Sequence, residues 1–553
     1  MPYVMTRHLT TVALGVAVSF TLPPLAAAQV DPTVTARVDE IFAQWDTPMS
    51  PGCAVGVTQN GETLLERAYG MADLEWGIPN TAETIFEGGS VSKQFTAATV
   101  NLLVLDGVLS LDDDVRNWVP ELPDYGHTIT LHQLMTHTSG LRDWGSVSSI
   151  SGWGRSDRAH DHDDVVDILS RQTALNFEPG LEYSYSNSGY NLLAVVVDRA
   201  SGMSFADFSK TRLFEPAGMT STQWRDDFRR IVQGRSSAYN RTDDGWEINR
   251  PVEYVHGNGG ILTTVRDLGI WNQILTTGGP WGQEFLTLMH RPGVLIDGSE
   301  INYAGGLSLT PLENVQAVTH TGSTAGYRAY LGRFPEQGIS VAMLCNASNV
   351  STGGAGGRIA LAFLGDAVQG EQAPDYRRES AGFDLDPFVG LYREPLTGGP
   401  LEITLSDGTL YAGSSPLLPL SGSEFQVGSS ERRYVFERYG STVVGFEVED
   451  WQYSARRYER VTGWSPNAAE FLAFEGEYRS EDAETTFRVT ATDGGLEIWQ
   501  RPNDTFEVTP IYNDGFRSGG RIVRFRRDSA GQVIELSLSL GRVYDMRFAR
   551  VEH

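Results

Sequence analysis

The last third of this chain contains two copies of one module. The segment FVGLYR at 388–393 returns as FEGEYR at 474–479, and RYERV at 457–461 returns as RFARV at 547–551. Between these markers, short alternating runs are separated by glycine turns, as is typical of β-strands. Each copy is long enough for an eight-stranded up-and-down barrel. The repeat therefore predicts two small all-β domains at the C-terminal end and excludes a fold with a single core.

The 553 residues are too many for one core, so several domains are expected. We predict a first domain over residues 29–370 and a polar, charged linker at 371–386. The two barrel domains are expected at 387–463 and 464–553.

The first domain combines strand and helix patterns. Residues 51–70 are expected to form a hairpin around Asn60-Gly61, and the almost entirely apolar stretch after Ser90 indicates a central buried helix. Strand-like runs close the domain at 315–319, 327–334 and 339–345. Strands at both ends with helices between them predict an α+β fold, in which helices flank an antiparallel sheet that the first hairpin joins.

Residues 1–28 have the pattern of an export signal. Arg7 and His8 precede an apolar stretch, and Ala26-Ala27-Ala28 supplies small residues for cleavage after Ala28. The stretch is too short and too interrupted by proline for a confident membrane span. No cysteine follows it, so a lipid anchor is not expected. We predict a periplasmic or secreted protein without a membrane anchor.

The formal net charge of −27 limits the classes of partner. It disfavours binding to nucleic acid or to an anionic membrane and favours solubility. A homodimer is compatible with the sequence, which does not define the oligomeric state.

Two cysteines, Cys53 and Cys345, are present. Each lies at the end of an apolar run, so a disulfide could form if those runs pair antiparallel in an oxidising compartment. Because cysteine often behaves as a small apolar residue, two buried thiols are the simpler interpretation.

Lysine occurs only at Lys93 and Lys210, while arginine supplies the other 41 cationic side chains. Arginine stays protonated in proteins, whereas a buried lysine can lose its proton and act as a base. Lys93 follows Ser90 by three residues, a spacing that puts both on one helix face. Burial and the helix N-terminus both lower a lysine pKa, so Ser90 and Lys93 are a candidate nucleophile and base.

Two further motifs follow in order. Tyr185-Ser186-Asn187 precedes an apolar helix, and His320-Thr321-Gly322 lies on a predicted strand. With Ser90-x-x-Lys93, the chain here resembles the serine β-lactamase and penicillin-binding protein superfamily, over about residues 30–365. Its nearest architecture is the D-aminopeptidase branch, which also carries two C-terminal β-barrels.

The resemblance implies a role for each motif residue. Ser90 would be the acylated nucleophile, Lys93 its proton acceptor and Tyr185 a second general base that returns the proton to the leaving group. Asn187 would hold Lys93 and the substrate amide. The backbone N–H groups of Ser90 and Ser323 would form the oxyanion hole, beside the substrate-binding residues Thr321 and Gly322.

His320 departs from the lysine of the lactamases and cell-wall carboxypeptidases. Histidine is largely neutral at pH 7, so strong selection for a free carboxylate is not expected from it. Histidine here resembles the D-aminopeptidase branch and some esterases; it could also be a satisfied residue outside the chemistry. In that branch a loop of the last barrel limits access, and 501–504 is our candidate for that loop.

The sequence leaves three functions open. The first is an exported serine hydrolase acting on small D-amino-acid peptides or amides, without cofactor or metal. The second keeps the mechanism but acts on carboxylic esters or β-lactams, and the third is a binding or sensor protein that turns over slowly or not at all. His160-Asp161-His162-Asp163-Asp164 resembles metal ligands, but its last two residues fit a helix N-terminus better. His137 is expected to be structural.

Overall fold

The computed structural model describes residue 1 and residues 30–155, 157–368, 384–428, 430 and 432–552. The predicted export signal and most of the predicted linker lie outside these residues. Within them, no helix has the length and apolar character needed to cross a membrane.

A five-stranded antiparallel sheet with the order β10-β11-β12-β1-β2 organises the first domain. The predicted hairpin at 51–70 is confirmed, with Asn60 and Gly61 at positive φ between its strands. The hairpin joins the later antiparallel sheet, as expected, and its first strand pairs with the last strand of the domain. The five strands are β1 Cys53–Gln59, β2 Glu62–Tyr69, β10 Val318–Thr324, β11 Tyr327–Phe334 and β12 Ile339–Cys345.

One predicted strand is displaced. The run at 315–319 was expected to be extended, but β10 starts at Val318 and continues to Thr324. The ladder with β11 sets these limits, because its pairs run from Val318–Arg333 to Thr324–Tyr327. The displacement puts His320, Thr321 and Ser323 inside the strand, at the edge of the sheet.

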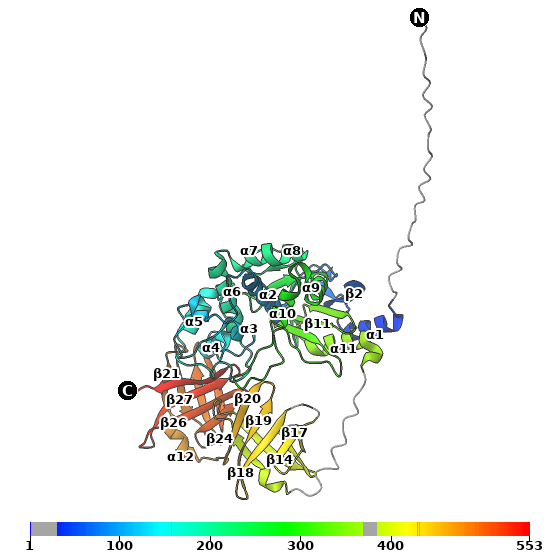
Figure 1. Ribbon diagram of the computed structural model, residues 1–553. Coiled ribbons are helices and arrows are strands. Elements are labelled where there is room, and N and C mark those ends of the chain that lie inside the picture. Colours follow the sequence, from blue (N-terminus) through cyan, green and yellow to red (C-terminus); the bar gives the residue numbers. More distant parts are fainter. Residues whose placement is uncertain (2–29, 156, 369–383, 429, 431, 553) are drawn as a thin grey trace.

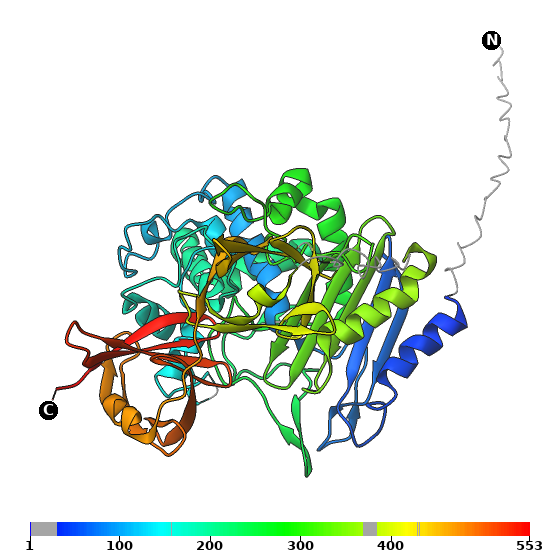
Figure 2. The same ribbon diagram turned by 90° about the horizontal axis from the view of Figure 1, so that it is seen from below.

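Helices cover both faces of the sheet (Figures 1 and 2). α1 (Pro32–Phe42) and α11 (Thr352–Leu364) pack on one face with side chains such as Val55, while α9 packs against β1, β11 and β12 on the other. α2 (Ser92–Leu105) is the predicted central helix and is buried along most of its length. The other helices are α3 Leu131–Met135, α4 Trp144–Ile150, α5 His162–Ser170, α6 Asn187–Ser201, α7 Phe205–Ser209, α8 Glu215–Ala217, α9 Val265–Thr277 and α10 Gly282–His290.

Cys53 and Cys345 form a disulfide. The interpretation as two buried thiols is therefore wrong. The cause is the pairing of β1 with β12, in which Cys53 and Cys345 are direct cross-strand neighbours. The bond ties the first strand of the domain to its last across 292 residues of sequence.

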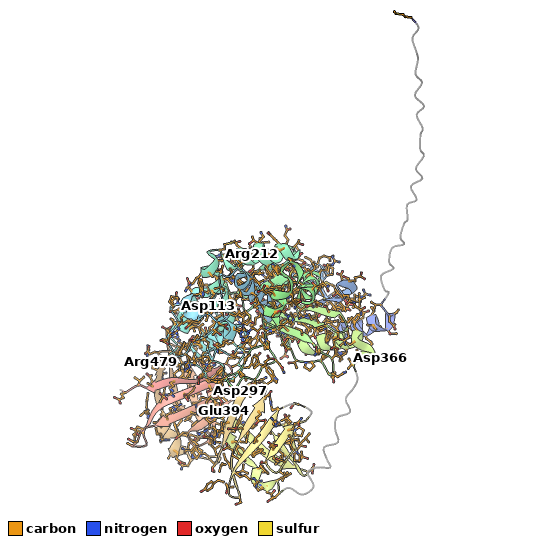
Figure 3. All side chains as sticks on the ribbon, in the orientation of Figure 1. Asp113, Arg212, Asp297, Asp366, Glu394 and Arg479 are labelled. Carbon is orange, nitrogen blue, oxygen red and sulfur yellow. A yellow bond between two sulfur atoms is a disulfide. The ribbon has the colours of Figure 1, made fainter. Side chains whose placement is uncertain are left out.

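Two closed eight-stranded antiparallel barrels follow, as the repeat predicted. The first contains β13 Gly390–Arg393, β14 Pro400–Ser406, β15 Thr409–Ala412, β16 Ser415–Pro419, β17 Glu424–Val427, β18 Arg433–Tyr439, β19 Thr442–Asp450 and β20 Tyr453–Val461. The second begins with α12 (Ala468–Phe471) and contains β21 Gly476–Ser480, β22 Thr485–Ala491, β23 Leu496–Gln500, β24 Asp504–Tyr512, β25 Gly515–Ser518, β26 Arg521–Arg527, β27 Val533–Leu540 and β28 Val543–Arg550. In Figure 3, Glu394 marks the first barrel and Arg479 the second.

The repeated residues have the same structural task in both barrels. The buried phenols of Tyr392 and Tyr478 donate to the carbonyls of Phe388 and Phe474, both at 2.8 Å. These bonds tie each barrel's first strand to the turn that precedes it. The repeated arginines Arg460 and Arg550, on the last strands, donate to backbone carbonyls beside these turns, so the repeated residues also join the last strand of each barrel to its start.

Candidate active site

Ser90 lies in a single 3₁₀ turn (η1, Gly89–Val91) that leads directly into α2. The turn touches the edge strand β10: a Cβ atom at Gly322 would lie 2.0 Å from the carbonyl oxygen of Gly88 and 3.1 Å from the backbone nitrogen of Ser90. Only glycine at 322 permits this approach. It brings the backbone of Ser90 beside β10, where the proposed oxyanion-hole residue Ser323 follows.

The amine of Lys93 is completely buried and has three neighbours. Nζ lies 2.7 Å from the carbonyl oxygen of Asn258, 3.0 Å from Oδ1 of Asn187 and 3.3 Å from Oγ of Ser90. The two carbonyl oxygens can only accept, so they take both N–H bonds of a neutral amine. The remaining lone pair is then available to the Ser90 hydroxyl, which can donate to it.

The surroundings of Lys93 favour that neutral form. Burial lowers the pKa of Lys93 well below its usual value, and the positive charges of Arg542 and Arg155 lower it further, while Asp143 opposes the shift. A buried amine with two cations nearby gives up its proton more readily than one in water. Lys93 is thereby better suited to accept a proton than a lysine in water.

Tyr185 and Asn187 stand at the N-terminus of α6, where the sequence placed them. Nζ of Lys93 lies 4.7 Å from the centre of the Tyr185 ring. Burial raises the pKa of the Tyr185 phenol, although a hydrogen bond with Ser90 and the charge of Arg542 oppose that change. The phenol is therefore protonated at neutral pH and in contact with the candidate nucleophile.

His137 holds the chain on both sides of Tyr185. Its carbonyl oxygen accepts from the Ser184 N–H at 2.9 Å, and its Nδ1 accepts from the Ser186 N–H at 3.2 Å. Its ring lies 4.3 Å from that of Tyr185, between centres. The backbone of His137 has a positive φ of 61°, which non-glycine residues rarely adopt. His137 was expected to be structural, and its contacts on both sides of Tyr185 were not predicted.

His320 faces the cavity as a neutral ring. Nδ1 lies 2.6 Å from the carbonyl oxygen of Thr321, which can only accept, so Nδ1 carries the proton. Nε2 then accepts from the Tyr303 hydroxyl at 2.9 Å. Burial, together with the charge of Lys93, lowers the pKa of His320 to about 4. Both ring nitrogens are used within the protein, and the ring carries no charge at neutral pH.

The predicted site residues surround one cavity of about 350 Å³. The cavity is lined by Ser90, Tyr185, Asn187, His320, Thr321 and Ser323. Lys93 lies behind this lining, within hydrogen-bonding distance of Ser90 and Asn187. Gly322 sets the distance between β10 and the Ser90 turn. The cavity also contains residues that sequence reasoning missed, namely Asn258, Arg155 and Arg542.

The barrel residue at the cavity is Arg542, not the predicted loop 501–504. Arg542 lies in the turn between β27 and β28, and its guanidinium carbon is 4.7 Å from the centre of the Tyr185 ring. Arg501 instead donates to the carbonyl oxygen of Ser151, away from this cavity. The prediction failed because sequence spacing does not show which barrel turn faces the first domain.

The histidines that resembled metal ligands have other partners. Asp161 caps α5 through a capping box with Asp164, as the helix interpretation predicted. His160 contacts Ser148, and Nε2 of His162 lies 3.0 Å from the carbonyl oxygen of His256. Among the described residues, no group of three or more His, Cys, Asp or Glu side chains is arranged to hold a metal ion.

The chain is similar in sequence to a penicillin-binding protein and to a D-aminopeptidase. It is 32% identical over 306 residues to Penicillin-binding protein 4* of Bacillus subtilis, covering 52% of this chain and 66% of that protein. It is 27% identical over 351 residues to a D-aminopeptidase of Gluconobacter oxydans, covering 63% of this chain and 66% of that one. The chain thus spans slightly less than two thirds of these two relatives.

A solved structure and a family model agree with this placement. The octameric penicillin-binding protein homologue from Pyrococcus abyssi shares the fold, with a TM-score of 0.53, 22% identity, and coverage of 77% of this chain and 99% of that one. The family model described as Beta-lactamase matches residues 30–364, more than half of the chain. With the sheet, the buried lysine and this match together, the protein belongs to the β-lactamase family.

Proposed function

We propose that the protein is a serine hydrolase that forms an acyl-enzyme through Ser90 on small peptide or amide substrates. The contacts of Lys93 carry this proposal. Two carbonyl acceptors occupy the N–H bonds of its neutral amine, so the lone pair is available to the hydroxyl of Ser90.

Acylation follows from these positions. Ser90 Oγ bonds to the substrate carbonyl carbon while its proton passes to Nζ of Lys93. Negative charge on the carbonyl oxygen is stabilised by the N–H groups of Ser90 and Ser323. As the intermediate collapses, the C–N bond breaks, the phenol of Tyr185 gives its proton to the leaving nitrogen, and the ammonium of Lys93 restores the phenol. The products are the free amine and an ester on Ser90.

Water completes the cycle. A water oxygen bonds to the acyl carbon of the ester while its proton passes to the Tyr185–Lys93 pair. The ester C–O bond breaks, Ser90 Oγ regains a proton, and a carboxylic acid leaves. The raised pKa of Tyr185 and the lowered pKa of Lys93 divide the work: the amine accepts protons and the phenol passes them on.

The substrate class we propose is small peptides or amides that contain D-amino acids. The similarity to a D-aminopeptidase and the neutral His320 support this class. Ester or β-lactam hydrolysis uses the same residues and is the alternative. A binding or sensor protein that acylates without turnover is the alternative of another class, and the complete hydrogen-bond set around Lys93 weighs against it.

Three chromogenic substrates test the proposal. Purified protein is incubated with D-alanine p-nitroanilide, p-nitrophenyl butyrate and nitrocefin, and intact-mass spectrometry follows adducts on Ser90. Release from the anilide supports the amidase, release from the ester or nitrocefin alone supports the alternative substrates, and a stable adduct without release supports the sensor. Absence of both adduct and release, or release that persists in Ser90→Ala, would reject the acyl-enzyme mechanism.

We also propose that the protein is exported by residues 1–28. Fractionation of the producing cells with N-terminal sequencing tests this. A mature chain that begins at Gln29 outside the cytoplasm is expected, and a full-length cytoplasmic chain would contradict it.

A further inference from the structure

The cavity at Ser90 is lined by cations without an acidic side chain. Among the described residues that line it, Arg155 and Arg542 carry positive charge, and none is aspartate or glutamate. This composition is unexpected in a protein whose formal net charge is −27. A substrate's ammonium group would find no carboxylate here, whereas an anionic group would find two guanidinium groups.

The charges behind the cavity do not cancel this excess. Arg155, Arg225 and Arg235 share two buried carboxylates, Glu87 and Glu253, at distances from 2.6 to 3.4 Å. Three guanidinium groups on two carboxylates leave one positive charge. Arg155 is the member of this cluster that lines the cavity, where its charge is paired with Glu253.

Arg542 has hydrogen-bonding capacity to spare. Its contact with the carboxylate of Asp143 is a long one of 3.7 Å, and its side chain is 41% exposed. Asp143 in turn accepts from the N–H groups of Asn187 and Ser146. A guanidinium has five N–H donors in a fork that matches a carboxylate, and this one faces the cavity with most of them unused.

The position of Arg542 is fixed even though its charge is partly exposed. Its carbonyl oxygen accepts from Nδ2 of Asn176 at 2.9 Å and from the N–H of Asp143 at 3.3 Å. Oδ1 of Asn176 also accepts from the N–H of Tyr544 at 2.8 Å. The backbone of the turn is therefore held against the first domain at Arg542 and Tyr544, so the turn itself needs no reordering when a ligand binds.

We propose that Arg542 is the carboxylate-binding residue of this site, so that the preferred substrates are acyl compounds with a free carboxylate, such as peptides with a free C-terminus. The inference rests on the proposed function. His320, on the edge strand, is neutral and has both nitrogens occupied, so it offers neither charge nor a free donor. The second barrel thus supplies a cavity guanidinium whose carboxylate contact is long, at 3.7 Å, whereas Arg155 of the first domain is paired with Glu253 at 2.6 Å.

The net negative charge of the whole protein also acts on an anionic substrate, but salt limits the range of that repulsion. A net −27 repels anions at long distance, but at physiological salt such interactions are screened beyond about 8 Å. Arg542 lies within that range of Tyr185, since its guanidinium carbon is 4.7 Å from the centre of that ring. Carboxylate selection is therefore a local property of the cavity.

Two esters that differ in a single carboxylate test the inference: phenyl phenylacetate and 3-(phenylacetyloxy)benzoate. Values of kcat/KM for both are measured at 0.15 M salt on the pH plateau with wild type, Arg542→Gln, Arg542→Lys and the control Arg547→Gln. Arg547 lies on β28, the strand that follows Arg542, and pairs with Asp545 at the surface. We expect wild type to prefer the carboxylate ester and Arg542→Gln to lower that preference by about tenfold to a hundredfold. Arg542→Lys should keep part of it, and Arg547→Gln all of it.

A preference that survives Arg542→Gln, or an equal loss for both esters, would overturn the inference, since the second result means that Arg542 acts only on Lys93 or on packing. Calorimetric binding of the same two esters to Ser90→Ala and to Ser90→Ala/Arg542→Gln separates binding from chemistry. Selective binding that depends on Arg542 without wild-type turnover would refute the proposed function and leave the inference standing. Turnover of both esters without a carboxylate preference would support the proposed function and overturn the inference.

Discussion

The two barrels are copies of one fold, yet they meet the first domain in different ways. Buried apolar side chains of the second barrel belong to the same cluster as the core of the first domain, whereas those of the first barrel form a core of their own. The second barrel also places Asp482 in a buried ion pair with Arg142, at 2.6 Å. The first barrel is joined by backbone hydrogen bonds, such as Tyr183 N–H to the carbonyl oxygen of Gln452.

Equivalent turns of the two barrels approach the same segment. The turn between β19 and β20 stacks Trp451 near Tyr183, with ring centres 5.3 Å apart. The corresponding turn between β27 and β28 sets Arg542 against Tyr185, two residues further along. Closure of the barrel is specified by the repeated residues, while the turn residues have diverged. The two barrels therefore share one fold, but among the described residues only the second barrel contributes a side chain, Arg542, to the cavity.

The largest loss of turnover is expected from a substitution in the first domain, and the effects of substitutions in the barrels are compared with it. Lys93→Arg should lower turnover by about two to four orders of magnitude, because arginine cannot accept the Ser90 proton. Steady-state kinetics on whichever substrate is turned over measure this. Lys210→Arg is the matched control, since Lys210 is the other lysine and is exposed. Activity above a few per cent in Lys93→Arg would remove Lys93 from the mechanism.

The second barrel should be more tightly coupled to the first domain than the first barrel is. Asp482→Ala leaves Arg142 buried without its carboxylate partner, which typically costs about 3–5 kcal/mol. The midpoint of thermal unfolding should fall, and activity with it as Arg542 loses its support. Glu437→Gln in the first barrel breaks an exposed pair with Arg457 and should change stability by less than about 1 kcal/mol. Equal shifts in the two variants would contradict the comparison.

The sequence predicted the features that recur along it or follow from local chemistry. The repeat predicted both barrels, and the spacing of Ser90 and Lys93 placed them within reach of each other. Asp163 and Asp164 predicted a helix N-terminus, and α5 begins at His162. Each of these follows from neighbours in the chain, where geometry is nearly fixed by spacing.

What the sequence did not predict depends on segments brought together by the fold. Cys53 and Cys345 meet only because β1 pairs with β12 in a register that no local pattern sets. Arg542 and Ser90 line one cavity although more than four hundred residues separate them in sequence, whereas the sequence favoured 501–504. His137 holds the residues on both sides of Tyr185 through a positive φ and two hydrogen bonds. Neither feature can be predicted from the sequence.

The pH dependence of kcat/KM should change when a cation of the second barrel is removed, but not when one of the first barrel is removed. Lys93 must be neutral to accept a proton, so activity rises with pH through its lowered pKa. The positive charge of Arg542 disfavours the ammonium form, so Arg542→Gln should raise the pKa of Lys93 and move the acid limb of the kcat/KM profile to higher pH. Arg456→Gln in the first barrel should leave the limb in place. A limb that moves to lower pH, or moves in both variants, would contradict the charge argument.

The smallest effect is expected from the turn of the first barrel. Trp451 contacts Tyr183 and does not line the cavity, so Trp451→Ala should change kcat/KM by less than about threefold, mainly through lost packing. The ratio of rates for the carboxylate and neutral esters should not change, in contrast to Arg542→Gln. Kinetics with both esters on the pH plateau measure this. If Trp451→Ala altered that ratio as strongly as Arg542→Gln, the first barrel would also select the substrate, and both copies of the module would have been recruited to the cavity.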